Sequence, residues 1–248
     1  MKDTKLEDLW EAPAQPGAPF SEQDVAGLPG TAQRYLRHAI ALGTPRASIV
    51  RLQMHGSIRL AGSWHPFEAE QVIRWDRGFV WHAKARMHGL PVTGYDRWID
   101  GEGEARWKLL GIIPVMSASG KDTSRAAAER MQIESMWVPA VLLHKDVRWS
   151  EHDSAHIAVD MSVRDQHAHC ELSLAETGQP RWTSMQRWSN LAGTPFRPLP
   201  FGGLVEAERT FDGYTIPSTL RVGWYFGTNR FESEGEFFRC TVDRARYR

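Results

Sequence analysis

The chain has 248 residues, of which 42% are hydrophobic and 24% are charged, and these values are ordinary for a globular protein. Its thirty basic residues balance its thirty acidic residues, which argues against a nucleic acid or an anionic membrane recognised through bulk charge. No segment has the length and composition of a signal peptide or of a membrane-spanning helix. We therefore expect a cytoplasmic protein without an integral membrane segment and without a nucleic-acid partner.

The N-terminal segment is mixed in charge and then rich in proline, alanine and glycine. This composition predicts a flexible tail over residues 1–20, although Leu6, Leu9 and Trp10 have the spacing of a short amphipathic turn that docks on the protein. The regular hydrophobic patterns begin after this tail, and we expect a single domain over residues 21–248.

A helix is predicted over residues 28–43. Pro29 fits its first turn, and Gly43 fits its end because a proline follows two residues later. Apolar residues recur at helical spacing and mark its buried face: Leu28, Ala32, Tyr35, Leu36 and Ala39.

From Arg51 onwards the hydrophobic pattern has a period of two, which is typical of strands with one face in water. The clearest example is 79–87, where the residues at odd positions are all apolar. Glycine-containing turns separate successive runs. Strands are predicted at residues 51–60, 67–75, 79–87, 92–99 and 104–110, and later at 147–150, 155–163, 168–174, 181–190, 204–211, 216–226 and 231–242.

Three further features concern the connections between these strands. Residues 110–116 lead into the middle segment of the chain. Residues 194–203 contain three prolines and two glycines and are predicted to form a loop at the rim of the protein. Near Phe237 the apolar residues change phase, which predicts a β-bulge there.

Residues 120–149 form the one strongly helical segment in the middle of a chain that is otherwise predicted to be β-rich. Asp122, Thr123 or Ser124 can cap its N-terminus, and the alanines that follow favour a helix. Pro139 disfavours helical geometry at the preceding residue and predicts a break. The predicted fold is mainly β with inserted helices: a single large curved antiparallel sheet, or half-barrel, plugged by this central helical insert.

Glu134 interrupts the apolar face of the insert, where Met131, Ile133, Met136 and Trp137 surround it. One interpretation is a carboxylate at the edge of the helix, paired with an arginine or in contact with water. The other is a carboxylate in an apolar cleft, with a raised pKa and the capacity to act as a general acid or base. Both interpretations remain open from the sequence.

Eleven tryptophans are many for a chain of this length, and their rings suit protein cores and ligand clefts alike. The strand at 181–190 has one face that is neither cleanly apolar nor cleanly polar, as in a cleft wall or in an ordinary sheet edge. Arg187 on this strand can pair with Glu134 or hold a carboxylate or phosphate headgroup. The candidate ligand-binding residues are Trp81, Tyr95, Trp107, Glu134, Trp137, Trp182, Arg187, Trp188 and Trp224.

The ten histidines raise the question of a metal, but no metal-binding spacing, nucleotide-binding loop or catalytic motif is present. His167 and His169 lie on the face of a predicted strand opposite its apolar face, so they are expected to point to water. Cys170 and Cys240 lie far apart in the sequence; a disulfide is possible but unsupported, and a reducing compartment is the default. We expect no metal and no cofactor.

Several motifs together resemble those of a bacterial protein family of unknown function, and the match covers nearly everything after residue 27. The fold of that family is similar to the lipoprotein-carrier (LolA) group. The resemblance therefore implies a half-barrel whose concave side receives acyl chains around plugging helices, and it implies no particular activity. The motifs are Leu28-Pro29, Arg34-Tyr35-Leu36, Gly78-Phe79-Val80-Trp81, Asp100–Gly103, Leu110-Gly111, Glu134-x-x-Trp137-x-Pro139-x-x-Leu142-Leu143, Gly213–Pro217 and Trp224.

Our first hypothesis is a protein that binds a hydrophobic or amphiphilic, lipid-like small molecule in an apolar cleft between the sheet and the insert. The alternative is a metal-independent isomerase, lyase or hydrolase in the same cleft. In that case Glu134 is the general acid or base, and Tyr95 or Arg187 polarises the substrate. A third possibility is a scaffold whose aromatic residues all belong to the core.

Overall fold

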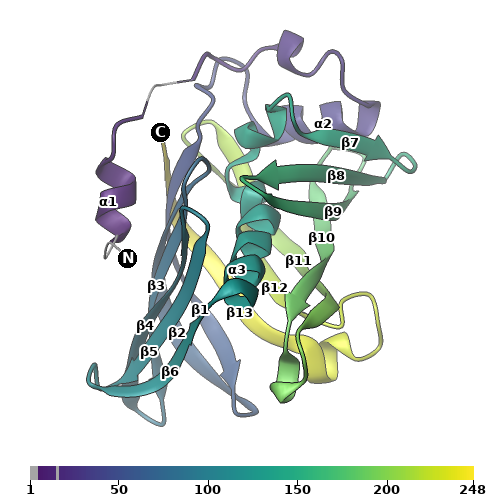
Figure 1. Cartoon of the computed structure of the whole chain (residues 1–248). Coiled ribbons are helices and arrows are strands. Elements are labelled where there is room, and N and C mark those ends of the chain that lie inside the picture. Colours follow the sequence, from purple (N-terminus) through teal and green to yellow (C-terminus); the bar gives the residue numbers. More distant parts are fainter. Residues whose placement is uncertain (1–4, 15–16) are drawn as a thin grey trace.

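The computed structural model describes residues 5–14 and 17–248, and the described residues contain one antiparallel sheet of thirteen strands (Figure 1). The strand order is β6-β5-β4-β3-β2-β1-β13-β12-β11-β10-β9-β8-β7, so neighbouring strands are consecutive in the chain except for β1 and β13. The strands are β1 Ile49–Leu60, β2 Ser63–Arg74, β3 Gly78–Met87, β4 Leu90–Ile99, β5 Glu102–Leu109, β6 Ile113–Ser119, β7 Arg148–Glu151, β8 His156–Val163, β9 Gln166–Leu174, β10 Pro180–Ser189, β11 Arg197–Phe211, β12 Tyr214–Trp224 and β13 Glu236–Tyr247.

The sheet curves around a central helix, α3, which lies between its two halves (Figure 1). This helix contacts β4 and β5 from one half and β9 and β10 from the other. Its side chains at Ala128, Met131 and Gln132 are fully buried. The predicted fold class, a curved antiparallel sheet plugged by the helical insert, is confirmed. The helical elements are α1 Leu6–Glu11, η1 Glu22–Asp24, α2 Gly30–Ala39, α3 Lys121–Ile133, η2 Glu134–Trp137, η3 Pro139–Leu143, η4 Leu191–Gly193 and η5 Phe231–Gly235.

The N-terminal segment is partly packed. Of the predicted flexible tail at 1–20, residues 1–4 and 15–16 lie outside the described residues. The expectation is corrected for Leu6–Glu11, which forms α1 on the convex face of the sheet, where Leu9 is fully buried against Val72 and Val80. The alternative of a docked amphipathic turn describes this part of the chain.

Strand β6 was not predicted, because its sequence does not alternate. Consecutive residues from Ile113 to Ser117 are all exposed, so neither face of this strand has the burial that produces a period of two. It is an edge strand of the sheet and pairs only with β5.

The proline-rich segment at 194–203 is not entirely a loop, since β11 begins at Arg197. Pro198 and Pro200 pair with β10, whereas pairing with β12 begins only at Phe201. Proline is tolerated in a strand where its missing N–H faces an open side of the sheet. The first residues of β11 have such a side.

The predicted bulge near Phe237 is present. Val222 pairs with Phe238 and Gly223 pairs with Glu236, so Phe237 is the extra residue on β13. The bulge brings the consecutive rings of Phe237 and Phe238 to the same cavity, which regular alternation would prevent.

The helical insert breaks before Pro139, as predicted, and continues as the short turns η2 and η3. The expected N-terminal capping is not formed, because the residue before the helix is Gly120 and no side chain caps the first turn. Instead, the Ser124 hydroxyl donates to Gly120 O at 2.9 Å and accepts from the Gly103 N–H at 2.8 Å. This side chain therefore fastens α3 to β5. Within the described ranges, none of the helices has the length and apolar character needed to span a bilayer.

Candidate functional site

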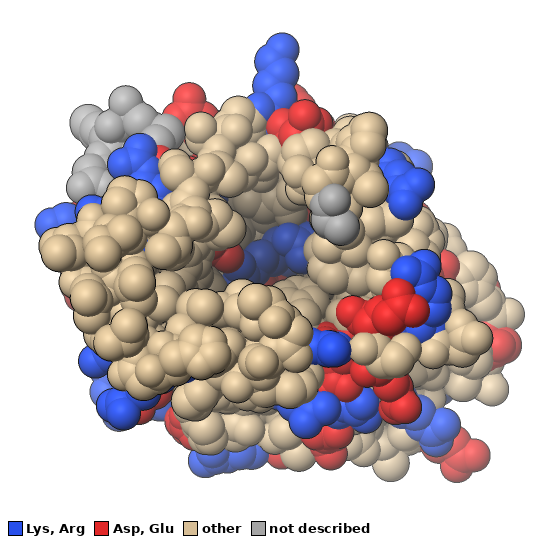
Figure 2. Space-filling model, turned by 90° about the horizontal axis from the view of Figure 1, so that it is seen from below, with Lys and Arg blue, Asp and Glu red and all other residues tan. Residues whose placement is uncertain are grey.

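A cavity of about 290 Å³ lies between the concave face of the sheet and the C-terminal end of α3 with η2. Viewed from below, the molecule is hollowed, with basic and acidic atoms visible in the depth of the hollow (Figure 2). The charged residues that line the cavity are Asp96, Arg130, Glu134 and Arg187. Its other lining residues are mostly apolar: Ile58, Trp81, Ile133, Met136, Trp137, Thr183, Phe201, Gly203, Leu220, Val222, Trp224, Phe237 and Phe238.

Aromatic rings from adjacent strands pack against one another to form the cavity wall. The ring of Phe238 stacks on Phe67 at a centroid distance of 4.9 Å and meets Trp81 at 6.0 Å. On the neighbouring strands, Phe201 and Trp224 lie 4.9 Å apart. Because these rings already support each other, the wall keeps its shape without a guest.

Arg130 is the centre of a polar cluster at one side of the cavity. Its Nε donates to Glu134 Oε1 at 2.8 Å, and its Nη1 donates to Asp96 Oδ2 at 2.9 Å. The second oxygen of each carboxylate also accepts a hydrogen bond. Gln71 Nε2 donates to Glu134 Oε2 at 2.6 Å, and Trp107 Nε1 donates to Asp96 Oδ1 at 3.0 Å. The cluster links α3 to strands β2, β4 and β5.

Glu134 therefore matches the first of the two interpretations made from the sequence. Both of its oxygens accept hydrogen bonds, and its partner is Arg130 rather than Arg187. Neither oxygen of Glu134 is therefore left without a hydrogen-bond donor.

Arg187 has a different environment. Its guanidinium donates to the backbone oxygen of Ala126 at 3.2 Å and lies 4.6 Å from the ring of Phe201 and 5.4 Å from that of Trp224. Among the described residues, no carboxylate oxygen lies within 4.0 Å of it. Burial, together with the nearby Arg130, lowers the pKa of Arg187 to about 10, which is still well above neutral pH. A charged guanidinium thus faces the cavity without a carboxylate in direct contact.

The structure brings together five of the nine predicted ligand-binding residues. Trp81, Glu134, Trp137, Arg187 and Trp224 line the cavity. They come from β3, η2, β10 and β12, so only the curvature of the sheet makes them neighbours.

The other four predicted residues do not line it. Trp107 stands beside the wall, where its ring lies 5.6 Å from that of Trp81. Trp182 lies on the face of β10 opposite the lining residue Thr183, and its ring contacts Phe226. The indole of Trp188 donates to Asp122 at 2.8 Å and attaches β10 to the start of α3.

Tyr95 lies on the convex face of β4. It directly precedes Asp96, which lines the cavity, and consecutive residues of a strand point to opposite faces. The Tyr95 hydroxyl donates to Glu104 at 3.2 Å, and its ring lies 5.3 Å from the Arg97 guanidinium. Of the two polarising residues named for the enzyme alternative, Tyr95 therefore does not share the cavity with Glu134, whereas Arg187 does.

Sequence reasoning missed Asp96, Arg130 and Gln71. One signal was present for Arg130, which stands four residues before Glu134, the spacing of an ion pair on one helix face. Asp96 shares its phase in β4 with the buried Val92 and Trp98. No local signal places Gln71 beside Glu134, because they are 63 positions apart.

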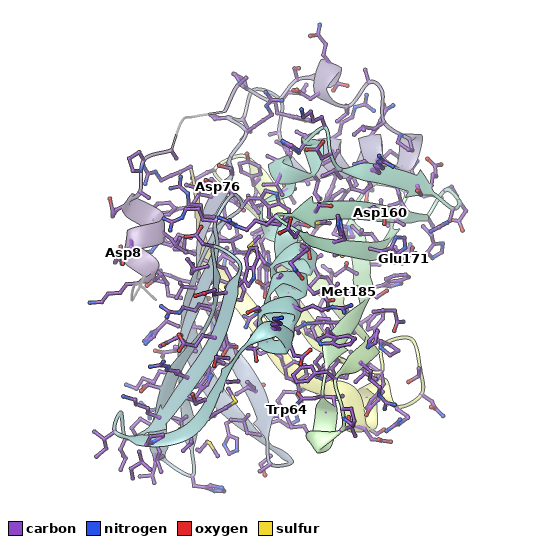
Figure 3. All side chains as sticks on the ribbon, in the orientation of Figure 1. Asp8, Trp64, Asp76, Asp160, Glu171 and Met185 are labelled. Atoms are coloured by element: carbon purple, nitrogen blue, oxygen red, sulfur yellow. The ribbon has the colours of Figure 1, made fainter. Side chains whose placement is uncertain are left out.

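The two histidines of β9 are exposed, and they have different partners: His167 Nδ1 lies 2.6 Å from the Ser162 hydroxyl, whereas His169 contacts acidic neighbours. His169 contacts Asp160 at 2.8 Å and Glu171 at 2.9 Å, and both acids are labelled in Figure 3. The hydrogen bonds that His169 makes to the carboxylate of Asp160 and, secondly, to that of Glu171 raise the pKa of His169. Across the described ranges, no group of three or more histidine, cysteine, aspartate or glutamate residues is arranged to hold a metal ion.

The two cysteines lie in the core as free thiols. Burial raises the pKa of Cys170 and of Cys240 to about 12. Because the thiolate is the reactive form, we expect neither cysteine to react with Ellman's reagent in the native protein at mildly alkaline pH, and both to react in guanidinium chloride. Rapid reaction of either thiol before unfolding would contradict this burial.

The protein is thus of the half-barrel class: an open antiparallel sheet curves around a central helix, with a ligand-sized cavity between them. The chain belongs to a family of unknown function, DUF6920, whose sequence model matches residues 26–247. This confirms the resemblance drawn from the motifs. A search of curated protein sequences found no match.

Solved structures with a similar fold come from three bacteria. A LolA superfamily protein from Nitrosomonas europaea has 8% identity and a TM-score of 0.44, with 88% of this chain and 92% of that one covered. A DUF1329 family protein from Desulfovibrio piger has 11% identity and a TM-score of 0.45, with coverages of 88% and 90%. A putative outer membrane lipoprotein-sorting protein domain from Vibrio parahaemolyticus has 9% identity and a TM-score of 0.42, with coverages of 81% and 86%. At these identities the likeness concerns the fold alone.

Proposed function

We propose that this protein binds a small amphiphile, with a hydrocarbon chain and an acidic headgroup, in the cavity between α3 and the sheet. The observation that carries the proposal is the pairing of an apolar, preformed cavity with the Arg187 guanidinium, which no carboxylate of the described residues contacts. Pockets for small ligands have volumes of about 300–1,000 Å³. The 290 Å³ available here is at the lower end and favours one chain over two.

The hydrocarbon chain supplies most of the affinity in this proposal. Removing apolar surface from water stabilises a complex by about 25 cal/mol per Å². Ile58, Leu220 and Val222 with the aromatic wall offer such surface. Since the wall is already packed, little reorganisation opposes binding.

An acidic headgroup fits beside Arg187 because the two carboxylates that line the cavity are paired with Arg130. Arg130 already contacts Asp96 and Glu134, so these carboxylates do not contact Arg187. A carboxylate or phosphate beside Arg187 gains charge-assisted hydrogen bonds in a largely desolvated place. A planar guanidinium suits both kinds of headgroup.

The test compares a fatty acid with its uncharged methyl ester, followed through the fluorescence of the lining tryptophans. We expect the protein to bind the acid about tenfold or more tightly than the ester, as a charge-assisted hydrogen bond implies. Arg187→Met should remove this preference and leave ester affinity nearly unchanged. Arg181→Met is the matched control, because Arg181 is an exposed arginine on the same strand.

Two outcomes would contradict the proposal in different ways. If neither the acid nor the ester binds to the parent protein, the cavity does not bind amphiphiles. If both bind equally and Arg187→Met changes nothing, the cavity binds a chain but Arg187 does not recognise its headgroup.

A further inference from the structure

The large exposed apolar side chains of this protein are concentrated at one end. The described residues contain eight of them, and seven lie at the turns β1–β2, β3–β4 and β5–β6 or on β6. These three turns lie at the same end of the sheet because β1 to β6 form an antiparallel meander. We name this end the hairpin tip and define it by Trp64, Leu90, Leu110, Ile112, Ile113, Val115 and Met116.

Two contacts show that the turns form one surface. The Leu110 N–H donates to Pro91 O at 2.8 Å, which ties the β5–β6 turn to the start of β4. The rings of His65 and His88 lie 5.6 Å apart, which places the β1–β2 hairpin beside the β3–β4 turn. Figure 3 labels Trp64 at this lower end of the molecule.

The tip is apolar on both faces of its outermost hairpin. Ile112 is 74% exposed, and the residues that follow it on β6 are exposed whichever face they point to. A folded protein partner would cover one face of such a hairpin. A lipid phase surrounds an inserted hairpin and covers both faces. Exposed apolar patches of this kind mark protein or membrane interaction sites.

The charges on the β3–β4 and β5–β6 hairpins of the tip have a single sign, whereas the exposed acids Glu232 and Glu234 belong to η5, which lies beside the end of β1, where Arg59 donates to Ser233 O. Residues 78–95 and 105–121 contain no aspartate or glutamate. Arg86 and Lys108 are exposed there, and no carboxylate of the described chain lies within 4.0 Å of either. Basic side chains beside exposed apolar residues are attracted to a surface that carries anionic lipids. The balanced net charge of the whole chain does not reveal this local asymmetry.

We infer that the hairpin tip docks on lipid bilayers that contain anionic headgroups, with Ile112 and its apolar neighbours inserted and Arg86 and Lys108 at the level of the headgroups. The hollow of the molecule is visible from the same lower side (Figure 2). Docking therefore turns the cavity toward the bilayer, so an amphiphile can pass between membrane and cavity without crossing water.

Flotation of the intact protein with vesicles of phosphatidylcholine, with or without phosphatidylglycerol, tests the inference. We expect the protein to float with the anionic vesicles, and double replacement Ile112→Ser with Val115→Ser to weaken partitioning about tenfold or more. Leu42→Ser is the matched control, because Leu42 is 63% exposed at the α2 end and should leave flotation unchanged.

A second pair of variants tests the charges. Arg86→Ser with Lys108→Ser should weaken binding to anionic vesicles and reduce its dependence on salt, whereas Lys145→Ser, at an exposed lysine after η3, should not. Arg187→Met should float as the parent does, which separates docking from guest binding.

The inference is overturned if the parent protein does not float with anionic vesicles. It is also overturned if sedimentation shows a dimer that Ile112→Ser with Val115→Ser converts to a monomer, because the tip would then be covered by a second copy through the open edge of β6.

Discussion

Replacing Arg130 with methionine is expected to lower the free energy of unfolding by about 3 kcal/mol. The substitution keeps much of the side-chain volume but removes the cation that contacts both Asp96 and Glu134. Arg130 is only 16% exposed and Glu134 only 13%. The two carboxylates would keep the hydrogen bonds from Gln71 and Trp107 but lose their counter-charge, and a partly buried charge without a counter-charge is costly.

Urea unfolding measured by circular dichroism gives the free energy, and an exposed pair provides the control. Arg230 and Glu234 have the same four-residue spacing, but they are 50% and 53% exposed. Arg230→Met should therefore cost less than about 1 kcal/mol. Adding Asp96→Asn and Glu134→Gln to Arg130→Met should restore much of the loss. Equal effects of the two single arginine substitutions would show that the cluster does not stabilise the fold.

Gly103→Ala is expected to destabilise the protein by about 1–3 kcal/mol, through overpacking between β5 and α3. A Cβ atom at Gly103 would lie 2.6 Å from the Cα of Ser124 and 2.8 Å from the backbone oxygen of Thr123. These are backbone atoms of the helix, so no flexible side chain can move away. Either the helix shifts or the strand does.

The same substitution should weaken amphiphile binding, because α3 carries Arg130 and supplies Ala126 O to Arg187. Gly27→Ala is the control, since a Cβ there meets no atom within 4 Å. Thermal unfolding and the fluorescence titration measure the two effects. Unchanged stability in Gly103→Ala would mean that helix and sheet are not held in close contact at this point.

Much of the fold could be predicted from hydrophobic periodicity. Strands with one buried face alternate, and the segment 79–87, observed as β3, does so clearly. The prediction failed for β6, whose faces are both exposed, and for the start of β11, where prolines at 198 and 200 resemble a loop. In β6 the burial that creates the usual signal is absent, whereas at the start of β11 the prolines conceal an alternation in which Leu199 and Phe201 are buried.

The candidate site could be predicted only in part, because a residue's phase must be known before its side chain can be assigned to a face. Tyr95 and Asp96 differ by one position, yet only Asp96 lines the cavity. The phase change at Phe237 was visible in the sequence, and it accounts for two rings in the cavity wall.

The sequence by itself determined most of the element types, the helical insert, the bulge at Phe237 and the unusual position of Glu134, because local periodicity and backbone preferences act over a few residues. Only the tertiary structure decided that Arg130 also contacts Asp96, while Arg187 lacks a carboxylate partner among the described residues. Only it gathered the apolar turns at one end. The physical reason is that these contacts depend on how the sheet curves around α3, and curvature brings together residues that no sequence interval relates.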